Sequence, residues 1–193
     1  MELALYHPKF GFYANGGAGR RQDFITSPET GPLFGVLVAK AIDQWWRELG
    51  TPDPFYFIEA GAGTGTLAKA ILRADLSCRN ALRYIAIETS ALQRSQHPEQ
   101  VESSERLPES IDTGIIFANE LLDNLPFNIY QSESNGNWRQ VCVGQSGGSF
   151  HEVLVECDQN QIKEFDVPER AGIRIPDQVE ARRWVNKALG SIQ

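Results

Sequence analysis

The chain has 193 residues, enough for one domain with a substantial core, and its 41% apolar and 22% charged residues are ordinary for a globular protein. The formal net charge of −7 argues against a nucleic acid as the principal partner, because phosphate binding requires a basic surface. The sequence contains no apolar run long enough to cross a bilayer, so no membrane-spanning helix is predicted.

Three cysteines, Cys78, Cys142 and Cys157, have neither the spacing of metal ligands nor the even number of a disulfide framework. We therefore predict reduced thiols and no bound metal. Reduced thiols, together with the absence of a signal-peptide pattern after Met1, predict a cytoplasmic location.

The beginning of the chain, residues 1–54, is predicted to form an aromatic and glycine-rich loop and a helix that pack on the core. Residues 6–29 are too irregular for a helix or strand and too rich in aromatic side chains for disorder. We therefore expect residues 6–29 to form an ordered lid on the domain.

A helix is predicted to follow this lid. Ser27 and Pro28 have the pattern of an N-cap and a first helical residue, and Glu29 suits the positive end of the helix dipole. The apolar positions that follow repeat with helical spacing and include Trp45 and Trp46. Both tryptophans are predicted to anchor the core or an interface and not to stack on a ligand.

Residues 55–66, with the sequence FYFIEAGAGTGT, carry the strongest chemical signal. The apolar run at their start is typical of a buried parallel strand. Gly61, Gly63 and Gly65 let the backbone turn sharply and let a ligand approach main-chain amides, and we call residues 61–65 the glycine turn. Helical spacing of apolar residues follows, so strand, glycine turn and helix together predict a ligand site.

Two carboxylates sharpen this prediction. Glu59 stands two residues before the glycine turn, and Glu88 ends a second apolar run, as nucleotide-binding βαβ units require of the acid that holds ribose hydroxyls. The glycine turn satisfies the relaxed fingerprint of a dinucleotide site, and S-adenosylmethionine fits the same frame. The Glu59 carboxylate would repel a pyrophosphate and attract an amino-acid ammonium, which favours S-adenosylmethionine.

Between the second and third predicted strands, His97 and Pro98 are expected to end a short helix, with His97 as an exposed terminator. A short edge strand is expected near Val101. Only His7 and His151 occur elsewhere, so a metal site or histidine-centred catalysis has little support.

The third apolar run, residues 114–118, is predicted to be a buried strand. Because ligands lie beyond the carboxyl ends of strands in open α/β sheets, we expect Asn119 and Glu120 to face the same crevice as Glu88. If a helical turn starts here, Glu120 and Asp123 share a face, and paired carboxylates could orient an arginine guanidinium for methyl transfer. The alternative is a helix cap with solvated acids.

Residues 127–178 are predicted to hold an antiparallel β meander and a loop. Strand-like alternation recurs in residues 127–130, 138–143 and 150–155, with glycine-containing turn signals between these runs. Residues 165–176 are expected to be loop. The helical spacing that follows predicts a final helix in residues 179–193.

Several blocks, in order along nearly the whole chain, resemble the MidA family of class I methyltransferases, which includes the mitochondrial complex I assembly factor. The blocks at 23–29 and 118–126 are more specific than the glycine turn. The blocks are residues 5–13, 23–29, 33–35, 59–67 and 118–126.

The resemblance implies a Rossmann-like methyltransferase that uses S-adenosylmethionine, with mitochondrial relatives acting on a protein arginine of a respiratory complex I subunit. It places Thr26, Ser27 and Glu29 at the border of the cofactor pocket. With the residues argued above, the candidate cofactor site is Thr26, Ser27, Glu29, Glu59, Gly61, Ala62, Gly63, Gly65, Glu88 and Asn119, and the candidate catalytic set is Asn119, Glu120 and Asp123.

Family members usually begin with a further helical segment and continue into more strands, so this chain resembles the cofactor-binding half. The predicted fold is α/β, an incomplete Rossmann-like class I methyltransferase sheet with an inserted antiparallel β meander. Residues 55–126 form its cofactor-binding core. One sheet edge and the apolar side of the 179–193 helix are expected to be uncovered, which favours either a homo-oligomer or a further partner.

Three functions are consistent with the sequence. The first is a methyltransferase acting on an arginine of a protein substrate, such as a complex I subunit. The second is a non-catalytic module that binds S-adenosylmethionine or assists assembly. The third is an NAD-dependent Rossmann enzyme.

Overall fold

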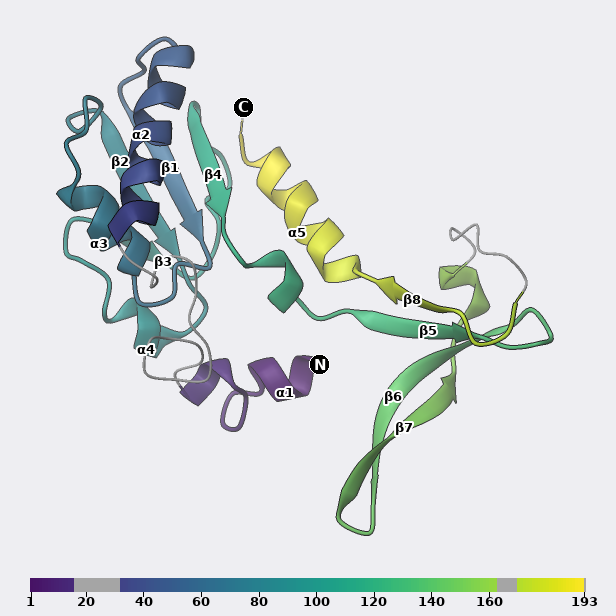
Figure 1. Cartoon of the computed structure of the whole chain (residues 1–193). Helices are drawn as coiled ribbons and strands as arrows, with labels where there is room; N and C mark the ends of the chain where they lie inside the picture. Colours follow the sequence, from purple (N-terminus) through teal and green to yellow (C-terminus); the bar gives the residue numbers. More distant parts are fainter. Residues whose placement is uncertain (16–31, 163–169, 193) are drawn as a thin grey trace. The chain divides into compact units, whose positions relative to one another are not determined.

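The residues that the computed structural model describes are 1–15, 32–162 and 170–192. The chain divides into two compact units, which are coloured by sequence in Figure 1. One unit comprises Met1–Asn124 and Arg183–Gln193, and the other comprises Leu125–Arg182.

The division of the sequence into four segments stays a prediction, because compactness alone does not establish that a segment folds by itself. The lid is described only up to residue 15, where it contains the short helix η1 (Tyr13–Asn15). The short helix α1 (Glu2–Tyr6) precedes it. The four predicted segments are 1–54, 55–126, 127–178 and 179–193.

The first unit is built on a parallel sheet whose strands have the order β3-β2-β1-β4 (Figure 1). Ala60, the last residue of β1, lies opposite the last residues of β2 and β4, so three carboxyl ends meet at one edge. This sheet confirms the Rossmann-like prediction, including the short edge strand. The strands are β1 (Phe55–Ala60), β2 (Leu82–Ile87), β3 (Glu102–Ser104) and β4 (Gly114–Ala118).

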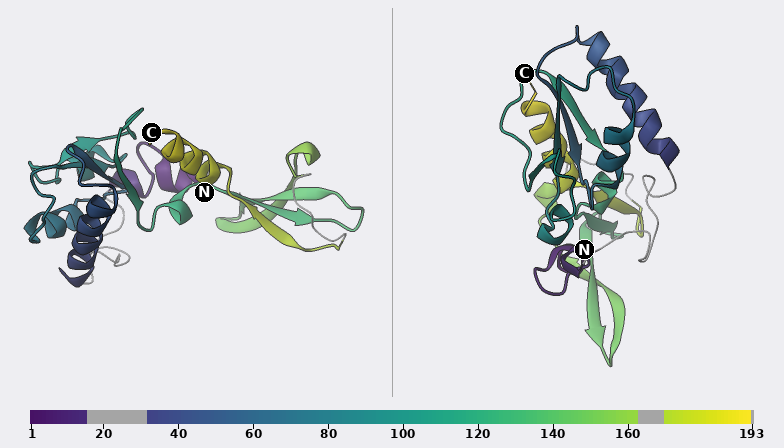
Figure 2. Two further views of the ribbon diagram at one scale, coloured as in Figure 1. Left: turned by 90° about the horizontal axis from the view of Figure 1, so that it is seen from above. Right: turned by 90° about the vertical axis from the view of Figure 1, so that its left-hand side faces the viewer.

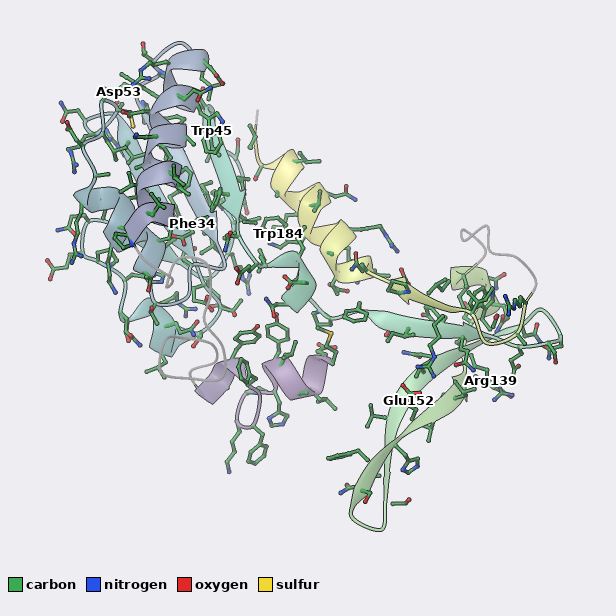
Figure 3. The ribbon with its side chains drawn as sticks, viewed as in Figure 1. Phe34, Trp45, Asp53, Arg139, Glu152 and Trp184 are labelled. Atoms are coloured by element: carbon green, nitrogen blue, oxygen red, sulfur yellow. The ribbon has the colours of Figure 1, made fainter. Side chains whose placement is uncertain are left out.

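Helices α2 (Pro32–Glu48) and α3 (Thr66–Arg73) cover one face of this sheet, as the right-hand view of Figure 2 shows. Their apolar sides meet alternate residues of the strands, such as the fully buried Phe57. Trp45 and Phe34 on α2 pack against this core (Figure 3). The prediction that Trp45 is a core residue is therefore confirmed.

The opposite face of the sheet carries α5 (Val179–Gly190), whose Trp184 packs against the sheet together with Ala188 (Figure 3). The intervening strand residues, including Ile58 and Ile85, supply the apolar surface. The expectation that the apolar side of the final helix lacks cover is therefore wrong for these residues, because β1 and β2 are apolar on both faces. In the described part of the chain, β4 pairs with β1 alone.

The second unit is an antiparallel sheet with the strand order β7-β6-β5-β8, which confirms the predicted meander (Figure 1). The starts of β5, β6 and β7 lie 10 and 11 residues apart, with glycine-containing hairpin loops between the strands, which suits consecutive pairing. The strands are β5 (Asn128–Ser132), β6 (Trp138–Ser146), β7 (Ser149–Glu156) and β8 (Arg174–Asp177).

The end of the predicted loop, by contrast, is strand β8. This part of the prediction was wrong for residues 174–176, which pair with β5 at the edge of the sheet, where proline is tolerated. The Arg174 guanidinium, on β8, donates two hydrogen bonds to the Glu152 carboxylate, at 3.0 and 2.6 Å. The contact depends on residues 22 positions apart and has no local sequence signal.

Within residues 1–15, 32–162 and 170–192, no helix is long and apolar enough to span a membrane. The three cysteines are free thiols. In the same ranges, no three His, Cys, Asp or Glu side chains gather as metal ligands.

Candidate functional site

The candidate site lies at the sheet edge where β1, β2 and β4 end together. The glycine turn leaves β1 there, and the amides of Gly61 and Ala62 both donate hydrogen bonds to the Ile87 carbonyl, at 2.9 and 3.0 Å. Gly65 then precedes α3, with its own amide bonded to the Ala62 carbonyl at 2.9 Å. The structure therefore brings together the residues of the glycine turn predicted from the sequence.

Gly63 is the residue of this turn with the most open surroundings. Its φ of +55° lies in the left-handed region, and a Cβ built on it would meet no described atom within 4 Å. Its amide donates a hydrogen bond to the Glu88 carboxylate, with N and Oε2 3.0 Å apart. The absence of a side chain leaves room for a ligand beside this amide.

Glu88 follows β2 and is only 8% exposed. Besides Gly63, its carboxylate accepts hydrogen bonds from the Ser90 amide at 2.8 Å and the Thr89 hydroxyl at 3.4 Å. A carboxylate has about four acceptor positions, so one remains for a further donor such as a ribose hydroxyl. The donor set around Glu88 thus fits the role predicted for it.

Glu59 is buried in β1, with 5% of its surface exposed. The Tyr84 hydroxyl donates a 2.6 Å hydrogen bond to its carboxylate. Burial raises the pKa of Glu59 to about 7, the Tyr84 hydrogen bond opposes the rise, and the charge of Glu88 adds to it. Tyr84 is a partner that the sequence did not suggest, and the interaction of Glu59 with a ligand ammonium stays a prediction.

The segment after β4 departs from the conditional expectation of a helical turn beginning at Asn119. Glu120 has a φ of +52°, and the short helix η3 (Leu122–Asn124) begins only afterwards. Helical spacing therefore does not relate Glu120 to Asp123, because the left-handed backbone at Glu120 interrupts the turn. Asn119 is half-buried, while Glu120 and Asp123 are exposed.

An aromatic pair that the sequence did not place at the site lies beside these acids. The rings of Tyr6 and Tyr13 are 5.3 Å apart, and the Tyr6 hydroxyl donates a 2.8 Å hydrogen bond to the Asn124 carbonyl. Burial raises the pKa of Tyr6 to about 12, with added contributions from the charges of Tyr13 and Glu88. Burial also raises the pKa of Tyr13, followed by the charges of Asp123 and Glu88.

The sequence signal for this pair was its aromatic composition alone. Aromatic side chains near the start of the chain predicted a lid without indicating which strand end it would meet. The three remaining predicted cofactor residues, Thr26, Ser27 and Glu29, lie outside the described residues.

His97 was expected to be an exposed helix terminator, and this expectation was wrong. It is half-buried, and its ring nitrogens lie 2.9 Å from the Gly63 carbonyl oxygen and 2.9 Å from the Ser103 hydroxyl. The contact with Gly63 spans 34 positions in the sequence. A histidine before a proline gives no local signal for such a contact.

A family model described as "Putative S-adenosyl-L-methionine-dependent methyltransferase" matches residues 37–191. The chain belongs to this family. The match confirms the family resemblance seen in the sequence and favours S-adenosylmethionine over the nicotinamide alternative.

Individual members of this methyltransferase family support the same assignment. The Drosophila melanogaster "Protein arginine methyltransferase NDUFAF7 homolog, mitochondrial" is 30% identical over 191 residues, covering 80% of this chain and 44% of that protein. The human "Protein arginine methyltransferase NDUFAF7, mitochondrial" is 26% identical over 177 residues, covering 74% of this chain and 40% of that protein. The chain thus spans less than half the length of these curated relatives.

A solved structure gives the same fold. A Burkholderia thailandensis protein whose crystal structure contains S-adenosyl-homocysteine is 25% identical, with a TM-score of 0.77. The similarity covers 99% of this chain and 54% of that protein. It confirms the predicted class I methyltransferase fold.

The relatives also correct one prediction. The cytoplasmic location is wrong, because the curated family members are named as mitochondrial proteins. Reduced thiols indicate a reducing compartment, and that property does not distinguish the cytoplasm from the interior of mitochondria.

Proposed function

We propose that this chain binds S-adenosylmethionine at the glycine turn and acts in methyl transfer to a nitrogen of a protein arginine. The observation that carries the proposal is the hydrogen bond from the Gly63 amide to the Glu88 carboxylate. It joins the turn after β1 to the acid after β2, the two elements that hold adenosyl ligands in Rossmann-like folds. The names of the arginine methyltransferase relatives supply the acceptor class.

The cofactor would be held by hydrogen-bond acceptors for its ribose and by a negative charge for its ammonium group. Glu88 has an acceptor position for a ribose hydroxyl, and Glu59 offers a carboxylate to the amino-acid ammonium. The turn residues Gly61, Ala62, Gly63 and Gly65 present backbone without bulky side chains. We propose that Asn119 and the lid residues Thr26, Ser27 and Glu29 complete the border of this site.

When bound, S-adenosylmethionine supplies a methyl group on a positively charged sulfur. The arginine nitrogen must place its lone pair opposite the carbon–sulfur bond, form the nitrogen–carbon bond, and lose one proton, while the breaking bond leaves its electrons on sulfur. Glu120 and Asp123 are suited to orienting the cationic guanidinium through charge-assisted hydrogen bonds. They would also receive the released proton or pass it to water.

The finer identity of the partners is part of the proposal. The acceptor protein is proposed to be a subunit of respiratory complex I, following the resemblance to the assembly factor. Self-association through the outer edge of β4 is also proposed, since among the described residues β4 pairs with β1 alone and its other edge presents backbone groups for pairing.

Ligand-induced stabilisation tests the cofactor site. S-adenosyl-homocysteine should raise the melting temperature and NAD should not. Gly63→Val should remove the rise, because a branched side chain would occupy the open space beside the amide. Gly136→Val is the matched control: Gly136 also has a positive φ and open surroundings, but it lies in the second unit.

A rise with NAD alone, or an equal rise in Gly63→Val, would contradict the site. Radiolabelled methyl transfer to an arginine-containing protein tests the reaction itself. Glu120→Gln should reduce transfer while S-adenosyl-homocysteine binding persists. Binding without any transfer in the unaltered chain would support the non-catalytic module.

A further inference from the structure

His97 contacts the glycine turn but belongs to neither the candidate cofactor residues nor the candidate catalytic residues. Its Nε2 lies 2.9 Å from the Gly63 carbonyl oxygen, and its Nδ1 lies 2.9 Å from the Ser103 hydroxyl on β3. The imidazole therefore connects the glycine turn to the edge strand of the sheet.

The identity of the partners fixes the tautomer. A carbonyl oxygen only accepts hydrogen bonds, so the hydrogen must be on Nε2. In the neutral ring Nδ1 is then the acceptor, and the Ser103 hydroxyl can donate to it. The Gly63 carbonyl thus selects the tautomer, and the Ser103 hydroxyl provides the matching partner for Nδ1.

The backbone N–H and C=O groups of Gly63 are consequently both hydrogen-bonded to side chains of residues 88–97. The amide donates to Glu88 directly after β2, and the carbonyl accepts from His97 before β3. Together these contacts fix the orientation of the peptide groups on both sides of Gly63. A residue with φ of +55° and no side chain has few other constraints.

Packing supports the same relationship. A Cβ built on Gly65 would lie 3.2 Å from His97 Cδ2 and 3.2 Å from Pro98 Cδ. The ring of His97 and the proline therefore lie directly against the second half of the glycine turn. His97 and Pro98 therefore contact the glycine turn in addition to following a helix.

We propose that His97 is a positioning residue for cofactor binding, which holds the glycine turn in its binding conformation while Ser103 holds the His97 ring in place. This inference rests on the proposed function. A turn that is already ordered loses less conformational freedom when it binds a ligand, so the contact should improve affinity without touching the ligand.

The variants His97→Leu, His97→Gln and Ser103→Ala separate positioning from general stability. Leucine removes the donor, whereas the glutamine side-chain amide can restore a donor near the position of Nε2. Calorimetry with S-adenosyl-homocysteine should show affinity about tenfold weaker for His97→Leu, with most of the loss recovered in His97→Gln. Ser103→Ala should be intermediate, and His151→Leu, in the second unit, serves as the control.

Amide hydrogen exchange without ligand gives a second measurement. Residues 61–65 should exchange faster in His97→Leu than in the unaltered chain, and His97→Gln should resemble the unaltered chain. Equal affinity and equal exchange in His97→Leu, or a glutamine variant as impaired as leucine, would overturn the inference. If the unaltered chain fails to bind the ligand, the proposed function fails, and the exchange comparison still decides whether His97 positions the turn.

Discussion

The Tyr84 hydroxyl donates a 2.6 Å hydrogen bond to the Glu59 carboxylate in the interior of the first unit. The two side chains come from neighbouring parallel strands and are 4% and 5% exposed. A carboxylate this deeply buried is costly to ionise, and one hydroxyl donor offsets only part of the cost. Glu59 therefore couples the protonation of the site to the stability of the fold.

Glu59→Gln should make the chain's stability less sensitive to pH. The pKa of Glu59 is raised by burial from an ordinary value of 4.5 to about 7, so the folded state retains the proton over a wider pH range than the unfolded state. This stabilising contribution is fully present below pH 4.5 and is lost as pH rises through 7. The difference in unfolding free energy between the two proteins should change by about 3 kcal/mol across that window.

Denaturant titrations of the ligand-free proteins at several pH values measure this difference. Glu109→Gln alters an exposed carboxyl and should follow the unaltered chain. A constant difference between Glu59→Gln and the unaltered chain from pH 4 to pH 8 would show that Glu59 does not titrate in this window.

Glu88→Gln should weaken S-adenosyl-homocysteine binding by about tenfold or more, as measured by calorimetry. The amides of Gly63 and Ser90 both donate to the Glu88 carboxylate, and a glutamine has only one oxygen to accept from them. Glu102→Gln changes an exposed acid on β3 and should bind normally. Unchanged affinity in Glu88→Gln would remove Glu88 from the cofactor site.

Gly35→Ala should destabilise the contact between α2 and α3. A Cβ built on Gly35 would lie 2.3 Å from the Ala70 Cβ, so the helices must separate, at a cost of about 1–3 kcal/mol. The double change with Ala70→Gly should be more stable than the two single changes predict together, by about 1 kcal/mol. Denaturant unfolding measures all three proteins, and simple additivity would contradict the contact.

Gly190→Ala is the control that separates the effect of crowding from the higher helix propensity of alanine. Gly190 ends α5, and a Cβ there would meet no described atom within 4 Å. This change should be neutral or slightly stabilising. A loss similar to that of Gly35→Ala would show that crowding against Ala70 is not the cause.

The parallel strands β1, β2 and β4 were predictable because each contains a short, continuous apolar run that is followed by polar or glycine residues. β1 is the clearest case, since both of its faces are buried by different helices. The glycine turn and Glu88 were predictable for a related reason, because their spacing along the chain is set by one βαβ unit.

The remaining features depend on contacts between distant residues. The Glu120 backbone has a left-handed conformation, which could not be predicted because this conformation is typical of glycine or asparagine and uncommon for glutamate. His97 contacts a carbonyl 34 positions away, and Tyr6 contacts one 118 positions away. The pairing of β8 with β5 similarly joins strands that are separated in the sequence by β6 and β7. Local composition and periodicity carry no information on such partners.

The strands β1, β2 and β3 are neighbours both in the sheet and along the chain. Glu59, the glycine turn, Glu88, His97 and Ser103 all belong to this uninterrupted stretch. The contacts of Gly63 with Glu88 and His97 span 25 and 34 positions, far fewer than the 118 positions between Tyr6 and Asn124, and smaller separations are favoured early in folding. Synthesis proceeds from the amino end. The proposed cofactor site is therefore expected to assemble on the ribosome before the antiparallel sheet has been translated.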